Sequence, residues 1–343
     1  MALPGIESVL VAGRGPAACS VIAACARLGV KSVAVHSETE RAARHVRLAD
    51  DAVLLGPAPA AESYLAVDRI VEAARRSGVD AVLPVPPALA GNARLAGAVL
   101  AADLMWVAPD PEVLDRLGGD GVEPASERGF LAWVTDDGLQ FTTAVERDRA
   151  AGIARVSWTP QRPAALPTAA RRLADVGWRG LVTVGVAPDG DLAEVSAGLS
   201  LDMAVLERAH RVDAVELALR SAIGGRPETP PAGEPRAAVA VQLRSTLPPG
   251  EAGTVRGRLP STTRATATEG AEVVAVHGYD RGERLVGWYD ALLATISAGA
   301  SDVATAARGA SSLLAGLPET GVPHDGEEVS AVLDRLARGT VPG

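Results

Sequence analysis

The stretch that decides the fold is SVLVAGRGP, residues 8–16. Its first five residues, four of them apolar, have the length of a buried strand, and a turn with two glycines follows. Pro16 stands where a helix would begin, and proline suits the first turn of a helix because its missing N–H has no partner there. The alanine-rich segment after it, to about Leu28, predicts that helix. A strand, a tight turn and a helix in this order are the opening of a βαβ unit.

The alternation of strand and helix continues along the first third of the chain. Apolar runs bounded by Gly, Pro or Asp predict the strands, and apolar residues at helical spacing predict the helices. The predicted strands are 32–36, 52–55 and 81–84, and the predicted helices are about 42–49, 67–77 and 92–101. Residues 1–115 are therefore expected to form a doubly wound α/β domain.

Beyond residue 117 the pattern changes to α+β. Residues 129–135 and 139–145, joined by a turn at 136–138, predict a β-hairpin. Residues 226–235 are rich in Pro, Gly and Glu, which is typical of a linker. We therefore expect a middle domain of residues 116–235 and a last domain of residues 236–343, in which short strands precede two closing helices. The other elements predicted in the middle domain are helices at 168–176 and 212–223 and strands at 181–184 and 192–195.

The composition excludes several classes of function. A formal net charge of −9 without a basic run argues against nucleic-acid binding. No run of about 18 apolar residues predicts a membrane span, and the first residues lack the pattern of a signal peptide, so a cytoplasmic protein is expected. Cys19 and Cys25 are expected as buried apolar side chains, and five scattered histidines give no metal-ligand spacing.

One lysine, Lys31, occurs among the 33 cationic side chains. It lies between a predicted helix and a predicted strand, where a solvated charge is expected. No other lysine is present to serve as a Schiff base, a phosphate clamp or part of a Walker loop. Chemistry that depends on several lysines is therefore not expected of this chain.

Three longer stretches of the N-terminal domain carry a family resemblance. They are RLGVKSVAVHS at 27–37, HVRLADDA at 45–52 and GPAPAAESYL at 56–65. In this order they resemble the biotin carboxylase component of acyl-CoA carboxylases. The resemblance implies a Rossmann-like N-terminal domain, an ATP-grasp body and a C-terminal β-rich domain with terminal helices. Weaker similarity extends through residues 177–180, 212–213 and 287–292.

The resemblance also implies an active site that this chain lacks in part. The family has a lysine after a Met/Leu-Gly-Asp turn, another lysine on the ATP-binding sheet and a glycine-rich lid, whereas residues 118–123 lead directly to the hairpin at Phe130. The two metal-binding glutamates of the family match Gly185 and Glu194. The arginine that steadies the biotin enolate matches Gln242, and the basic run that binds bicarbonate is missing. The ATP-grasp body is therefore expected to be truncated and to lack its lid.

Six charged residues are expected to converge on the former cleft. Asp202 matches the position of the bicarbonate-activating glutamate of the family, and Arg244 lies two positions from Gln242 on the same face of a strand. The cluster is either a relic salt-bridge network or a new site, and no metal or cofactor is expected there. The candidate residues are Glu146, Arg147, Asp148, Glu194, Asp202 and Arg244.

Two other motifs have competing interpretations. The pattern GRGPAA at 13–18, with Glu38 about twenty residues on, matches a dinucleotide-binding fingerprint, but the family pattern explains the same glycines as a tight turn. His277 stands close to Tyr279 and Asp280, which would suit acid–base catalysis. A surface turn is the other interpretation of that segment.

Two functions remain open. The first is a degenerate biotin carboxylase homologue without ATP-dependent carboxylation, a homodimer that acts as a non-catalytic partner or scaffold for acyl-CoA carboxylase subunits. The second is a repurposed cofactor-free enzyme of the isomerase, cyclase or lyase type that binds a small molecule of specialised metabolism in the former cleft. A cleft filled by paired charges favours the first, and an apolar pocket with a desolvated carboxylate favours the second.

Overall fold

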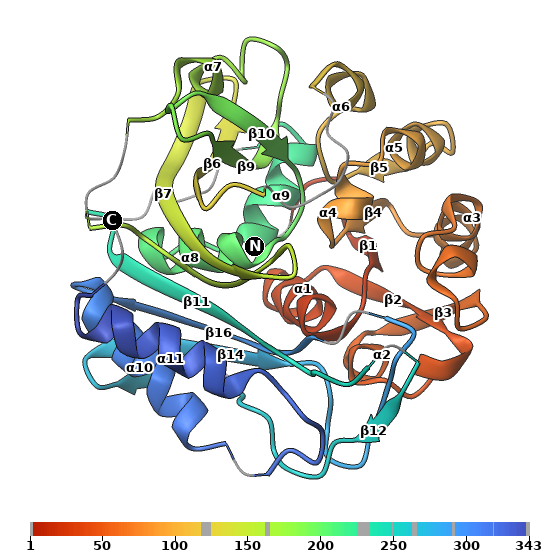
Figure 1. The fold of residues 1–343 in the computed structure, drawn as a ribbon. Helices are drawn as coiled ribbons and strands as arrows, with labels where there is room; N and C mark the ends of the chain where they lie inside the picture. Colours follow the sequence, from red (N-terminus) through yellow and green to blue (C-terminus); the bar gives the residue numbers. More distant parts are fainter. Residues whose placement is uncertain are drawn as a thin grey trace.

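Two sheets organise the chain in the computed structural model. Among the described residues, one is a five-stranded sheet and the other a nine-stranded sheet, accompanied by a two-stranded ribbon of β12 Ala252–Thr254 and β15 Arg284–Val286. Figure 1 shows the first sheet, in red and orange, beside the second, in yellow to blue. None of the described helices is long and apolar enough to cross a membrane. The structure describes residues 3–117, 125–161, 165–225, 234–248, 250–262, 266–289, 292–317 and 319–340.

The N-terminal sheet has the predicted α/β order. Its strands run β3-β2-β1-β4-β5, and all neighbours are parallel. A Cβ on Gly13 would lie 2.6 Å from Cβ of Val85, so the turn between β1 and α1 requires glycine there. The strands are β1 Ser8–Ala12, β2 Lys31–Ser37, β3 Asp51–Gly56, β4 Ala81–Pro84 and β5 Met105–Trp106. The α-helices are α1 Gly15–Leu28, α2 Arg44–Leu48, α3 Val67–Ser77, α4 Pro87–Ala90, α5 Ala93–Leu100 and α6 Pro111–Leu117.

The nine-stranded sheet extends through both regions beyond residue 115. Its order is β10-β9-β6-β7-β8-β11-β16-β14-β13, and neighbours are antiparallel. Because β8 pairs with both β7 and β11, the sheet is continuous across the domain boundary predicted at residue 235. Residues 226–233 of the predicted linker lie outside the described residues. The strands are β6 Arg128–Thr135, β7 Gly138–Ala150, β8 Ile153–Trp158, β9 Gly180–Val186, β10 Leu192–Ser196, β11 Ala237–Arg244, β13 Thr266–Thr268, β14 Ala271–His277 and β16 Leu292–Ala300.

Helices cover both faces of the nine-stranded sheet. On one face α8 and α9 share a core with β6, β7 and β11, which includes Leu131 and Leu206. On the opposite face α10 and α11 pack on β11, β14 and β16, around Ile296 and Leu333. Figure 1 shows α8 between the long arc of β7 and the strand β11, with α10 and α11 in blue. The four helices are α8 Leu201–His210, α9 Ala214–Ala222, α10 Val303–Ala315 and α11 Gly326–Ala337.

One helix was missed, and two local predictions differ from the structure. The helix α8 was not predicted, because its buried residues lie on several sides of the helix and leave no single apolar stripe. Strand β7 continues past residue 145 to Ala150, because β8 supplies a second neighbour for this part. The helix predicted at 168–176 ends at Arg171, and turns lead to Gly177, whose φ of 91° redirects the chain.

Candidate functional site

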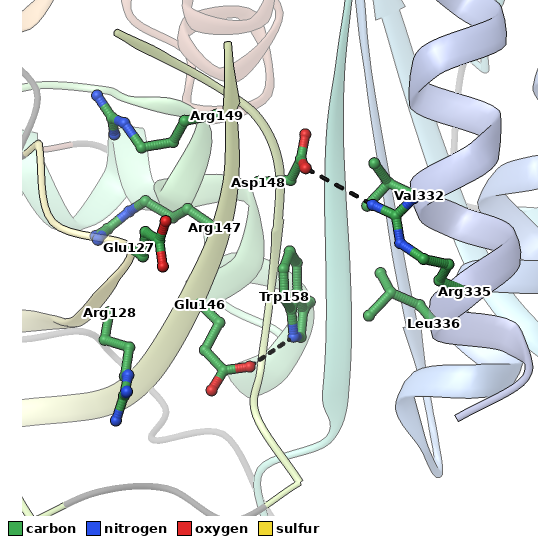
Figure 2. Close-up of a pocket in the computed structure, with 10 residues that line it drawn as sticks. All are labelled: Glu127, Arg128, Glu146, Arg147, Asp148, Arg149, Trp158, Val332, Arg335 and Leu336. Atoms are coloured by element: carbon green, nitrogen blue, oxygen red, sulfur yellow. Dashed lines mark hydrogen bonds and ion pairs between the residues drawn. The ribbon is translucent and has the colours of Figure 1, made fainter. Parts of the chain in front are cut away.

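Three of the six candidate residues are consecutive on β7, and the strand directs them to opposite faces of the sheet. Arg147 points towards α8, where it contacts Asp202. Glu146 and Asp148 point to the other face, towards α11, as Figure 2 shows. The charged groups of the three residues therefore lie on two faces of the sheet, although Arg147 also contributes to the lining of the groove beside α11.

Arg147 and Asp202 form a buried ion pair. Because α8 begins after Ser200, Asp202 stands in the first turn of the helix, where the helix dipole favours a carboxylate. Arg147 Nε donates to Asp202 Oδ2 at 2.8 Å, and Ser157 Oγ donates to the other carboxylate oxygen at 2.6 Å. Arg147 Nη1 donates to the backbone oxygen of Ser126 at 2.9 Å. The side chains of Arg147 and Asp202 are 1% and 4% exposed, so the pair is closed to solvent.

A glycine on the neighbouring strand gives Arg147 its space. Gly129 of β6 lies opposite Gly185 of β9, and a Cβ on Gly129 would come 2.8 and 2.9 Å from the guanidinium nitrogens of Arg147. Glu194 of β10 lies opposite Gly185 on the other side. It accepts a hydrogen bond from Ser126 Oγ at 3.0 Å, and the carbonyl of Ser126 binds Arg147. Glu194 therefore joins the network of the buried ion pair.

On the opposite face lies a groove of about 300 Å³, which Figure 2 shows between the strands and α11. Trp158 Nε1 donates to Glu146 Oε2 at 3.0 Å. Asp148 lies 2.8 Å from Arg155 and 3.8 Å from Arg335. Glu146 and Asp148 are thus engaged by neighbouring side chains. The lining residues are Glu127, Arg128, Glu146, Arg147, Asp148, Arg149, Trp158, Val332, Arg335 and Leu336.

Arg244 contacts a different set of residues at the end of β11. Its backbone N–H donates to Asp325 Oδ1 at 2.8 Å, and its guanidinium donates to Gln242 Oε1. Burial raises the pKa of Asp325, although the hydrogen bond from Arg244 opposes this effect. Arg244 therefore ties β11 to the start of α11, and it is not part of the Arg147 network.

A smaller apolar pocket of about 110 Å³ lies among α1, α8, α9 and the strands β11, β14 and β16. Two of its polar groups were missed by the sequence analysis. Ser200 Oγ is buried and has no hydrogen-bond partner among the described residues, and the carboxylate of Glu207 accepts from the N–H of Ala214 at 2.9 Å. Burial, assisted by the nearby Asp213, raises the pKa of Glu207 to about 7. Because α8 was not predicted, nothing in the sequence indicated that Ser200 and Glu207 share a pocket.

The remaining motifs have structural partners. His277 Nδ1 lies 2.8 Å from the carbonyl oxygen of Tyr279, and burial lowers the pKa of this histidine. Arg14 binds the buried carboxylate of Glu40 at 2.6 Å. Lys31 begins β2. It therefore lies at the end of the strands away from the turn that holds Arg14, which follows β1. Within the described ranges, no group of three or more His, Cys, Asp or Glu residues is placed to hold a metal ion.

Comparison with known proteins gives sequence similarity for the first third of the chain. Residues 5–114 match the family model described as biotin carboxylase, N-terminal domain. Over 112 residues the chain is 44% identical to a biotin carboxylase of Halalkalibacterium halodurans and 38% identical to the mitochondrial propionyl-CoA carboxylase alpha chain of Rattus norvegicus. Each match covers 33% of this chain, but 25% and 15% of the respective relatives. The matched segment is thus a small part of either relative.

Similarity of fold extends over nearly the whole chain. The structure of the K. lactis urea amidolyase aligns with a TM-score of 0.81 and a sequence identity of 22%. The alignment covers 99% of this chain and 22% of the amidolyase chain. The biotin carboxylase domain of a single-chain bacterial carboxylase aligns with a TM-score of 0.79, also at 22% identity. That alignment covers 98% of this chain and 95% of the bacterial domain. At this identity the likeness concerns the fold alone. The Rossmann-like parallel sheet and the antiparallel sheet confirm the predicted fold class: the chain has a biotin-carboxylase-like fold, and its residues 5–114 match the N-terminal domain of biotin carboxylase.

Proposed function

We propose that this chain is a degenerate biotin carboxylase homologue that does not carboxylate biotin with ATP and that acts as a non-catalytic partner or scaffold. The observation that carries this proposal is the buried pair of Arg147 and Asp202. Phosphoryl transfer needs fixed cations and metal ligands that face the phosphates, and each such group lowers the barrier by several kcal/mol. Here a central cation and a central carboxylate are engaged with each other instead.

The surroundings of the pair support the proposal. Gly185 stands opposite Glu194, so one carboxylate is present where the family resemblance implies two. Lys31, the one lysine of the chain, begins a strand of the other sheet. Glu146 and Asp148 are engaged by an indole and by arginines on the far face. A cleft in which charges pair with one another is what a non-catalytic homologue predicts.

The test of this proposal compares the chain with the biotin carboxylase of Halalkalibacterium halodurans under the same conditions. Each protein receives millimolar ATP, Mg²⁺, bicarbonate and free biotin, and both the melting temperature and biotin-dependent ADP release are measured. We expect neither an ATP-dependent rise in melting temperature nor ADP release from this chain, because a ligand stabilises a protein only when it binds the folded state. Both effects together in this chain would overturn the proposal.

The scaffold role needs a separate measurement. We expect the chain to be a homodimer in analytical ultracentrifugation and to co-elute with acyl-CoA carboxylase subunits of its own organism. Co-elution should survive the Asp115→Asn substitution on the exposed surface of α6, which serves as a control for nonspecific charge effects. A monomer that elutes apart from every such subunit would contradict the scaffold role while leaving the absence of carboxylation untouched.

A second candidate function is favoured by the apolar pocket beside α8. The spare hydroxyl of Ser200 and the carboxyl of Glu207, whose pKa burial raises to about 7, would suit acid–base chemistry on a small neutral substrate. If the chain is a repurposed isomerase, cyclase or lyase, Glu207→Gln should abolish product formation in the producing organism without lowering the melting temperature. Unchanged product levels in this variant, with Asp115→Asn as the control, would exclude a role of Glu207 in catalysis.

A further inference from the structure

A cavity of about 580 Å³ lies at the other end of α8 from the buried ion pair. It opens where β8 ends at Trp158, while its neighbour β7 extends back to Gly138 and its other neighbour β11 begins at Ala237. The chain after Trp158 stays beside β11, because the N–H of Thr159 donates to the carbonyl of Ala238 at 3.0 Å. The cavity therefore lies between β7 and this segment, residues 159–161. Its size falls in the range of ligand pockets, about 300–1,000 Å³.

One wall of this cavity is an edge of β7. Glu146 is the first β7 residue paired with β8, and residues 138–145 have β6 as their one strand neighbour among the described residues. The backbone N–H of Arg147 donates towards β6, to Glu127. Because backbone groups alternate in direction along a strand, Ala144 directs its N–H and C=O to the same side as Glu146, into the cavity. The structure gives those two groups no partner among the described residues.

The side chains around the edge are uncharged or already paired. Arg236 lies 2.7 Å from Glu272, and Asp302 accepts from the N–H and hydroxyl of Thr305 at the start of α10. His210 is neutral near pH 7 because burial lowers its pKa. A ligand that brought a net charge would find no free counter-charge in these groups.

His210 adds a polar ring to the cavity. Thr143 Oγ1 lies 2.9 Å from the carbonyl oxygen of Phe141 and 2.8 Å from His210 Nε2. When the hydroxyl donates to the carbonyl, the neutral histidine donates from Nε2 and its Nδ1 can accept; when the hydroxyl donates to Nε2, Nδ1 carries the proton and can donate. Together, the edge and the ring offer a donor and an acceptor of backbone geometry and one further polar nitrogen.

We propose that this cavity binds an extended, uncharged peptide segment of another protein, which pairs with the edge of β7 between that strand and residues 159–161. Backbone pairing would supply affinity, as in other cases of strand addition, and Thr142 and His210 would contact its side chains. The proposal is independent of whether the chain carboxylates biotin, because the cavity and the Arg147 network lie at opposite ends of α8.

The first experiment measures amide exchange and the binding of a probe peptide. In the unliganded protein the amide of Ala144 should exchange about 100-fold faster than that of Val145, which pairs with β6. The probe N-acetyl-Thr-Val-Thr-Val-amide should bind with a dissociation constant below about 1 mM, protect Ala144 and shift the NMR signals of Thr142 and His210. An Ala144 amide already as protected as that of Val145 would overturn the proposal.

Matched controls separate backbone pairing from nonspecific binding. The same peptide with methylated backbone nitrogens should not bind, because it cannot donate to the ladder. Ala304→Phe, which fills the cavity from α10, should weaken binding of the parent peptide at least about 10-fold, whereas Ala101→Phe at an exposed site should not. Equal binding of both peptides, or of both variants, would overturn the proposal. Protection of the Ala144 amide that increases with protein concentration in the absence of peptide would also overturn the proposal. It would show that the edge of β7 pairs with a second copy of this chain.

Discussion

Replacing Asp202 by asparagine is the sharpest test of the buried ion pair. The substitution keeps the shape of the side chain but leaves the charge of Arg147 uncompensated at 1% exposure. Removing one partner of a buried ion pair costs about 3–5 kcal/mol. At roughly 2.1 cal/mol/K per residue, cooperative unfolding of a chain of this length has an entropy near 0.7 kcal/mol/K, so the melting temperature should fall by about 4–7 °C.

The assay is calorimetry or a thermal scan of the parent, of Asp202→Asn and of the exposed control Asp115→Asn, which should shift by less than about 1 °C. A double variant, Arg147→Met with Asp202→Leu, should recover most of the loss, because a buried pair and apolar residues of similar volume are often close in stability. If Asp202→Asn has the same melting temperature as the parent protein, the ion pair does not stabilise the fold as described above. Loss of an activity in that same variant would assign Asp202 to catalysis instead.

Three further predictions concern titration. Burial raises the pKa of Glu207 to about 7, so in the folded protein this carboxyl keeps its proton over a pH range in which the unfolded chain has lost it. Stability should therefore fall as pH rises from about 4.5 to 7, and it should fall less in the Glu207→Gln variant. His45 has the opposite effect on the pH dependence of stability, because burial lowers its pKa to about 4. Stability should fall as pH falls from about 6.5 to 4, and it should fall less in the His45→Asn variant. Urea midpoints across pH check both, and equal pH slopes in parent and variant would contradict them. Burial raises the pKa of Cys19 and Cys25 to about 12, so iodoacetamide at pH 8 should label neither in the folded protein, as mass spectrometry would show.

Elements with strong local signals could be predicted from the sequence, and α8 could not. The helix Val67–Ser77 and the strand Ala81–Pro84 have the predicted bounds, and Gly78 ends the helix with a left-handed φ of 61°. By contrast, α8 is enclosed by α9, the sheet and the apolar pocket, so its buried residues surround it. A helix buried on several sides has no stripe of apolar residues at helical spacing.

The candidate site was predictable in its members more than in its geometry. Glu146, Arg147 and Asp148 were taken as one block, although neighbouring residues of a strand point to opposite faces. The partner of Arg147 is 55 residues away, and the contact depends on the missing side chain of Gly129. Such a contact is a property of the assembled sheet, and no local pattern of the sequence carries it.

The helix α8 links the features on which both proposals rest. Asp202 lies in its first turn and His210 ends it, about 12 Å apart at 1.5 Å per residue. Ser200 precedes the helix and Glu207 lies within it, so one rigid element positions the ion pair, the apolar pocket and one wall of the cavity beside β7. The Arg147–Asp202 pair holds the first turn of α8 against β7, and Thr143 holds the last residue against the same strand. Because the charges of Arg147 and Asp202 hold this helix against the sheet, we assign the pair a structural role. We expect binding instead at the uncharged edge of β7.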